Sequence, residues 1–307
     1  MAVLWAPHDA AVAERVRPWA REALAPVQSF ETVFYPFAGA DFLFPHAFFP
    51  RAHTYVLAGL ERVGKVSDLD ALPASAVAAT YARVEKAVTP LLTGSFFYTR
   101  EMESDLYQDG ILTLLVTFVG GTHHQILTVD TIELSADGHV TPAGSASGRG
   151  TPGGRITFVD DHDPTVRTLY YFRADISNAG LAKHGGLLAF MRTLSPPVTF
   201  TKAASYCMHG PLFSTIRDFV LTRSQAVLQD DTGVPLRSFD QATWDTQYFG
   251  LYKQPIPRFH NYFQPALAAA YADGAHVHPL TFHVGYGQMM ASNLLLATRR
   301  TALPHAR

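Results

Sequence analysis

The sequence predicts an α/β protein with a Rossmann-like fold, in which a mainly parallel sheet carries helices on both faces. Two observations favour this class. Short β-branched and apolar runs alternate with helical patterns along most of the chain, which is typical of parallel strands covered on both sides. The composition is 48% hydrophobic and 16% charged over 307 residues, which is enough apolar material to bury a large core. We expect a single α/β domain over residues 1–307, with an antiparallel, hairpin-rich β insertion at about residues 95–160.

The first part of the chain predicts a helix, a strand, a glycine turn, a short helix and a second strand. Asp9 is a suitable N-cap for the leading helix, and the strongest helical periodicity comes after the second strand. We expect helices over residues 9–24, 42–49 and 74–92, and strands over residues 32–37 and 54–60.

The middle of the chain predicts the antiparallel insertion. Residues 111–120 and 125–134 are rich in β-branched side chains and are joined by Gly-Gly-Thr-His-His, which indicates a hairpin. Residues 144–154 contain five glycines and predict a surface loop. The alternation then resumes, with strands expected over residues 168–172, 198–204 and 226–229 and helices over residues 186–194 and 211–223.

Charge and composition exclude several classes of partner. The net charge is -2 and no run of lysine or arginine is present, so a nucleic-acid partner is disfavoured. No stretch reaches the roughly 18 apolar residues of a membrane span. Cys207 is the only cysteine, which rules out an intrachain disulfide. A small molecule is the expected partner of a soluble protein. The oligomeric state stays open, and the compartment is cytoplasmic for the sequence as given or exported if a leader was removed.

Residues that directly follow strands are the first candidates for a site, because ligands of open α/β sheets lie at the carboxyl ends of the strands. A glycine turn lets the backbone approach a ligand, and an acid about twenty residues later can accept hydrogen bonds from a ribose. We expect one small-ligand site built from Tyr35, Gly39, Asp41, Glu61, Tyr206, His209 and Asp230.

The segment around Gly39 resembles the cofactor half of class I S-adenosylmethionine-dependent methyltransferases. Gly39 corresponds to the glycine loop and Glu61 to the acid on the ribose, while residues 198–229 continue as a strand, a helix and a strand. The resemblance covers about a third of the chain. It implies S-adenosylmethionine as the candidate cofactor, held by Tyr35, Gly39, Asp41, Glu61 and Tyr206. His209 and Asp230 are the catalytic candidates, with His209 as a base.

A second set of segments resembles a family of uncharacterised bacterial proteins, some of them apparent lipoproteins. The family segment Tyr-Pro-Phe-(Ser/Ala)-Gly-x-Asp-Phe corresponds to Tyr35 to Phe42. Ser205 to His209 and Gln229 to Pro235 extend this likeness over most of the chain. It looks like the closer match, implies no known activity, and points to an exported ancestor.

Other readings of the same residues stay open. Cys207 and His209 are two positions apart, a spacing that suits a thiol and its base, although a lone cysteine is more often a buried apolar residue. Asp230 and Asp231 can bind a cation, or they can belong to a turn, which we favour. His276 and His278 would share one face of a strand and can ligate a divalent metal if a third ligand joins them. The rival functions are therefore a non-catalytic binding or structural protein of the cell envelope and a histidine-bound metal protein. Whether the protein is an enzyme stays undecided.

Overall fold

The computed structural model describes residues 5, 14–66, 71, 73–94, 110–144, 150–203, 205–274, 276–286 and 292–300. Its helices are α2 (Glu14–Ala23), α3 (Leu43–Phe48), α4 (Ala74–Gly94), α6 (Ile111–Gly121), α7 (Asn178–Lys183), α8 (Gly186–Thr193), α9 (Ser214–Arg223) and α10 (Pro265–Ala272). Its strands are β1 (Thr32–Tyr35), β2 (Thr54–Gly59), β3 (His124–Leu134), β4 (Val140–Pro142), β5 (Thr151–Asp160), β6 (Asp163–Arg173), β7 (Val198–Thr201), β8 (Ala226–Gln229), β9 (Trp244–Gly250), β10 (Val277–His278) and β11 (Asn293–Arg299).

The strands form one mixed sheet in the order β10-β9-β11-β8-β7-β1-β2-β6-β5-β3-β4. The expected mainly parallel Rossmann-like sheet is therefore wrong. Parallel pairing joins β8, β7, β1, β2 and β6 at the centre and β10 to β9 at one edge. The other five pairings among the described residues are antiparallel and include the longest ladder, between β3 and β5. Antiparallel strands can pair without a crossover helix between them. The parallel sheet was predicted from short apolar runs, and such runs do not show in which direction neighbouring strands pair.

The predicted hairpin over residues 111–134 is wrong in its first arm, because residues 111–121 form α6. Its buried residues recur at helical spacing and are Ile111, Leu112, Leu114, Leu115, Phe118 and Val119. The β-branched Thr117 fits the helix because its hydroxyl donates to the carbonyl of Thr113, 2.8 Å away. An apolar run of this length suits either a buried strand or a buried helix, and packing on both sides selected the helix.

Other predicted elements agree more closely with the structure. The helix expected over residues 74–92 is confirmed as α4, and those expected over 186–194 and 211–223 correspond to α8 and α9. The expected glycine-rich loop is corrected at its end, where residues 151–154 already belong to β5. Residues 9–13 of the leading helix, 95–109 of the insertion and 145–149 of that loop lie outside the described residues.

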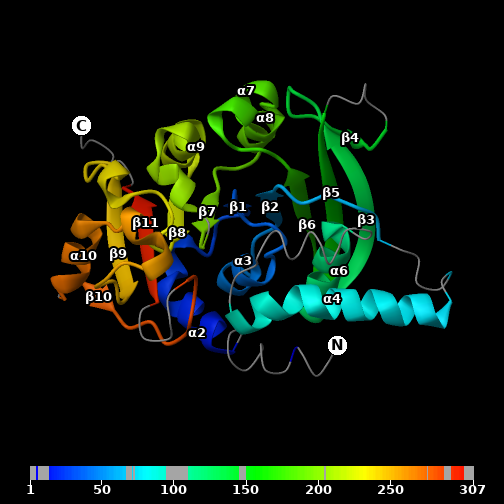
Figure 1. Ribbon diagram of the computed structural model, residues 1–307, viewed down its shortest axis with the longest axis horizontal. Coiled ribbons are helices and arrows are strands. Elements are labelled where there is room, and N and C mark those ends of the chain that lie inside the picture. Colours follow the sequence, from blue (N-terminus) through cyan, green and yellow to red (C-terminus); the bar gives the residue numbers. More distant parts are fainter. Residues whose placement is uncertain are drawn as a thin grey trace.

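Helices and irregular segments cover both faces of the sheet (Figure 1). One apolar cluster joins α2, α3, α4 and α6 to one face, and a second joins α7, α8, α9 and α10 to the other. Alternate residues of β1 divide between them, with Val33 and Tyr35 in the first cluster and Phe34 in the second. The alternation is the ordinary period of a strand, and both faces are apolar because both are covered.

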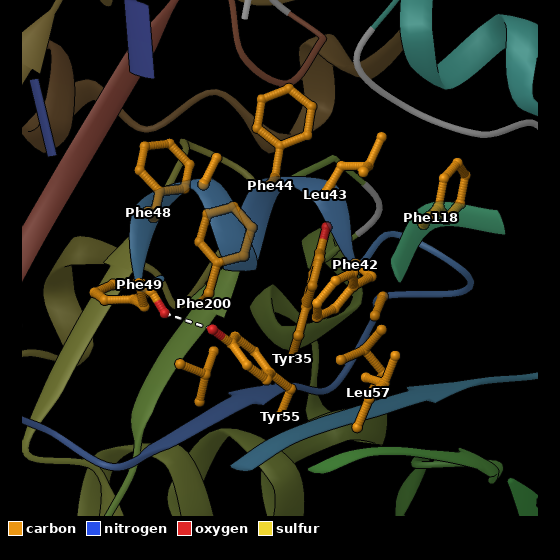
Figure 2. Packing of buried hydrophobic residues seen from close by; sticks show 14 of the residues in the cluster. Tyr35, Phe42, Leu43, Phe44, Phe48, Phe49, Tyr55, Leu57, Phe118 and Phe200 are labelled. Carbon is orange, nitrogen blue, oxygen red and sulfur yellow. Dashed lines mark hydrogen bonds between the residues drawn. The ribbon is translucent and has the colours of Figure 1, made fainter. Parts of the chain in front are cut away.

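The aromatic segment that contains α3 is core. Phe42, Phe44 and Phe48 are fully buried, and Figure 2 shows them gathered with Tyr35 and Phe200 around the short helix. The Tyr55 hydroxyl donates to the carbonyl of Phe49 at 2.6 Å, which gives the buried phenol a partner. This packing fixes the chain directly after β1, where the first predicted site residues lie.

Candidate functional site

The strand order of the parallel centre changes direction between β1 and β7, which is a topological switch point. The chain runs from β1 to β2 and β6 on one side, and from β7 to β8 on the other. The connections that leave the carboxyl ends of β1 and β7 therefore diverge, and a divergence of this kind leaves a crevice outside the sheet. A cavity of about 280 Å³ lies there.

Segments that follow four parallel strands line this cavity. Residues 35–39 and 41 lie at the end of β1 and after it, residues 59–61 at the end of β2 and after it, residues 174–176 after β6 and residues 202–203 after β7. Leu91 of α4, Cys207 and Phe213 complete the lining. Four of the predicted site residues share the cavity, namely Tyr35, Gly39, Asp41 and Glu61.

A buried ion pair lies at the inner end of the cavity. Lys202 Nζ is 2.8 Å from Asp41 Oδ2, and the two side chains are 1% and 2% exposed. The ammonium also lies 4.2 Å from the centre of the Phe44 ring, a favourable arrangement of a cation over an aromatic face. Asp41 Oδ1 accepts the Phe44 backbone N–H at 3.2 Å. The carboxylate is thus held between the first turn of α3 and the exit of β7.

Glu61 lies beside this pair at the end of β2. It is buried, and the Tyr171 hydroxyl lies 2.9 Å from its carbonyl oxygen and 3.0 Å from its Oε2. Burial and the Glu61 carboxylate raise the pKa of Tyr171, so the phenol stays a donor. A Cβ on Gly59 would lie 2.3 Å from Glu61 Oε2, which shows how closely the carboxylate approaches the backbone.

Tyr35 links β1 to the exit of β7. Its hydroxyl donates to the Lys202 carbonyl at 3.2 Å and lies 3.5 Å from Asp41 Oδ2. Burial, with Asp41 and Asp230 nearby, raises its pKa well above the usual value, so the hydroxyl keeps its proton. Ala203, the next residue of this exit, has a φ of 44°, a strained value for a residue with a Cβ.

Asp230 stabilises the strained turn at Ala203 through a hydrogen bond. Its Oδ2 accepts the Ala203 N–H at 2.9 Å, and its Oδ1 accepts the Thr232 hydroxyl at 2.6 Å. The neighbouring Asp231 accepts the Tyr206 hydroxyl at 2.6 Å and the Asn293 amide at 3.1 Å. Burial raises the pKa of both carboxyl groups. All four carboxyl oxygens have partners within the protein, which agrees with the preferred interpretation as a structural turn.

The structure separates Tyr206 and His209 from the cavity that holds Asp41. Tyr206 is stacked against Tyr262 with 4.8 Å between ring centres. His209 lines a second hollow with Arg237 and Asn261, and its Nε2 lies 2.9 Å from the Gly233 carbonyl. Burial lowers the pKa of His209 to about 4. The expected hollow shared by Asp41 and His209 is not formed, because residues 205–209 make a tight helical turn that directs His209 outward from it.

Cys207, in the same turn, does line the first cavity. Burial raises the pKa of its thiol to about 11, so the group is protonated at neutral pH. His209 contacts Gly233 and lines the other hollow. The geometry therefore offers no argument for the pairing of a thiol with a base.

The predicted histidine ligands are exposed and are not grouped. His276 and His278 are both exposed. Of the two, β10 contains only His278, so they do not share one face of a strand. No group of three histidine, cysteine, aspartate or glutamate residues that could hold a metal ion exists within the described part of the chain.

Sequence reasoning missed Lys202 and Gly59. Lys202 lies inside the strand expected over residues 198–204, whereas β7 ends at Thr201, so the rule that selected Asp41 did not select it. A lysine is usually solvated, and only the approach of β1 to β7 shows that this one is buried beside a carboxylate. Nothing in the sequence marks Gly59 as the point where Glu61 folds back on the strand.

Comparisons with other proteins add no assignment. Among the described residues, no helix combines the length and apolarity needed to cross a bilayer. The chain matches no family model, no curated protein and no solved structure.

Proposed function

We propose that this protein binds a small molecule in the cavity at the carboxyl ends of β1, β2, β6 and β7, and that S-adenosylmethionine is its ligand. One observation carries the proposal. Gly39, Asp41 and Glu61, which come from two different strand ends, line one cavity of about 280 Å³. This volume is slightly below the range of roughly 300 to 1,000 Å³ that is usual for ligand pockets.

The lining suits a ligand that donates hydrogen bonds. Asp41 and Glu61 contribute carboxylates at the buried end, where Lys202 supplies the one ammonium among the described lining residues. Carboxylates accept strong hydrogen bonds from hydroxyl and ammonium groups, and S-adenosylmethionine offers both. Glu61 follows β2, the place that the methyltransferase resemblance assigns to the acid on the ribose.

The strand order also supports the proposal. In chain order, the five parallel strands at the centre run third, second, first, fourth and fifth across the sheet. Ligands of open α/β sheets bind outside the carboxyl ends of the parallel strands at a switch point of this kind.

Calorimetry with S-adenosylmethionine tests the proposal. We expect saturable binding that Glu61→Gln weakens at least about ten-fold, since a charge-assisted hydrogen bond contributes about 1.5 to 3 kcal/mol. Glu133→Gln is the matched control, because Glu133 is a buried glutamate on β3 that accepts the Gly150 N–H and lies outside the cavity lining. The absence of binding heat with the folded wild-type protein would remove the proposal.

A further inference from the structure

The cavity has an unusual distribution of polarity. At its inner end, Lys202, Asp41 and Glu61 are 2%, 2% and 6% exposed. Towards solvent, Leu60 is 59% exposed, and the Phe37 and Phe213 side chains are half-buried. Apolar side chains at the opening are unfavourable in water, because exposed apolar surface costs about 25 cal/mol per Å² relative to burial. An apolar group that covers the opening would recover part of that energy.

The opening is lined by side chains from separate segments of the chain. We define the apolar rim as Phe37, Leu60 and Phe213, which line the cavity together with the buried Leu91 and Ile176. The Phe37 and Phe213 rings are 6.1 Å apart and tilted by 47°. Leu212, which directly precedes Phe213, is 72% exposed.

The shape of the rim favours a small molecule over a protein surface. Its residues enclose one concave space and continue inward to Leu91 and Ile176, which are 1% and 5% exposed. Ring faces such as those of Phe37 and Phe213 contact planar aromatic groups well. A flat protein partner would not reach the inner residues.

The charge near the rim disfavours an anion. Asp175 is exposed and lines the cavity, where its Oδ1 accepts the Ser177 N–H at 2.9 Å. Among the described lining residues, Lys202 is the one cation, and it is paired with Asp41 at the inner end. A carboxylate at the rim would therefore meet a like charge.

We propose that the apolar rim binds a second ligand, an uncharged aromatic small molecule, next to the ligand of the inner end. This inference rests on the proposed function, because both ligands share one cavity. The inference names the chemical class of a second molecule, which the protein would hold next to S-adenosylmethionine.

The probe for this inference is 2-naphthol, titrated by its fluorescence with and without S-adenosylmethionine. We expect Leu60→Ser to raise the dissociation constant at least three-fold, and Phe213→Ala to do the same. Leu127→Ser is the matched control, because Leu127 is 47% exposed on β3 and does not line the cavity. The anionic analogue 2-naphthoate should bind at least ten-fold more weakly than 2-naphthol.

The outcomes separate the two proposals. If S-adenosylmethionine gives heat but 2-naphthol does not bind, or binds Leu60→Ser and the wild type equally, the rim proposal is overturned and the proposed function stands. If 2-naphthol binds in a way that depends on Leu60 and S-adenosylmethionine gives no heat, the rim is supported and the assignment of the first ligand fails. Equal affinity for 2-naphthoate also overturns the rim proposal.

Discussion

Lys202 and Asp41 form an ion pair 2.8 Å long whose two side chains are 1% and 2% exposed. The pair joins the exit of β7 to the loop after β1, and these two segments diverge at the switch point of the sheet. It therefore holds together the two sides of the cavity. Its removal bears on both the stability and the shape of the site.

Lys202→Met should lower the free energy of unfolding by about 3 to 5 kcal/mol, because a buried carboxylate then loses its ammonium. The double variant Lys202→Met with Asp41→Asn should recover much of this loss, since it removes both charges of the ion pair. Urea denaturation of the single and double variants measures both effects. Additive losses in the double variant would mean that the two side chains are not energetically coupled.

Glycine substitutions should show the tight packing at the end of β2. A Cβ on Gly59 would lie 2.3 Å from Glu61 Oε2, 2.9 Å from the Tyr171 hydroxyl and 3.0 Å from the Gly39 Cα. Gly59→Ala should therefore lower stability by about 1 to 3 kcal/mol and weaken ligand binding. The matched control is Gly120→Ala in α6, where a Cβ meets no atom of the described residues within 4 Å, and it should stabilise by about 0.5 to 1 kcal/mol. Thermal and urea unfolding check the signs, and equal effects of the two substitutions would contradict this account.

The thiol of Cys207 should react slowly with alkylating agents. Burial raises its pKa from 9.0 to about 11, which lowers the thiolate fraction at neutral pH about 100-fold. Iodoacetamide labelling followed by mass spectrometry measures the rate at this single cysteine, and the unfolded protein in urea is the reference. The rate should rise up to about pH 11. A folded protein that labels as fast as the unfolded one would contradict the raised pKa of the half-buried thiol.

A buried histidine pair should make stability depend on pH. The His46 and His124 rings are 4.7 Å apart, and burial lowers the pKa of both below the usual 6.5. Because the folded state binds these protons less readily than the unfolded state, their contribution is present above pH 6.5 and is lost as the pH falls below it. The slope should reach about 1.4 kcal/mol per pH unit for each proton.

The variant His46→Gln tests that dependence. Its stability, measured by urea denaturation from pH 7.5 to pH 5, should fall less with acid than that of the wild type. His139→Gln is the control, because the His139 side chain is 79% exposed. Parallel pH profiles for the wild type and His46→Gln would show that the buried imidazole does not titrate in this range.

Local patterns in the sequence were sufficient for several elements. Patterns among neighbouring residues predict α4 from its helical periodicity and β1 and β2 from their β-rich runs. They also predict the order strand, helix, strand for β7, α9 and β8. The site rule also selected Tyr35, Gly39, Asp41 and Glu61, which line one cavity. Side-chain periodicity and the position of a residue after a strand are properties of short segments, so one sequence is enough to show them.

Tertiary structure alone decided the rest. The apolar run of α6 suits a strand or a helix until its packing partners are known, and the pairing of β11 with β8 and β9 joins segments far apart in the chain. Lys202 reads as a surface residue in sequence, and the parallel approach of β1 to β7 places it beside Asp41. The strand order, and the contact between Lys202 and Asp41 that follows from it, depend on interactions between residues far apart in the chain. A pattern of neighbouring residues holds no information on the energies of such interactions.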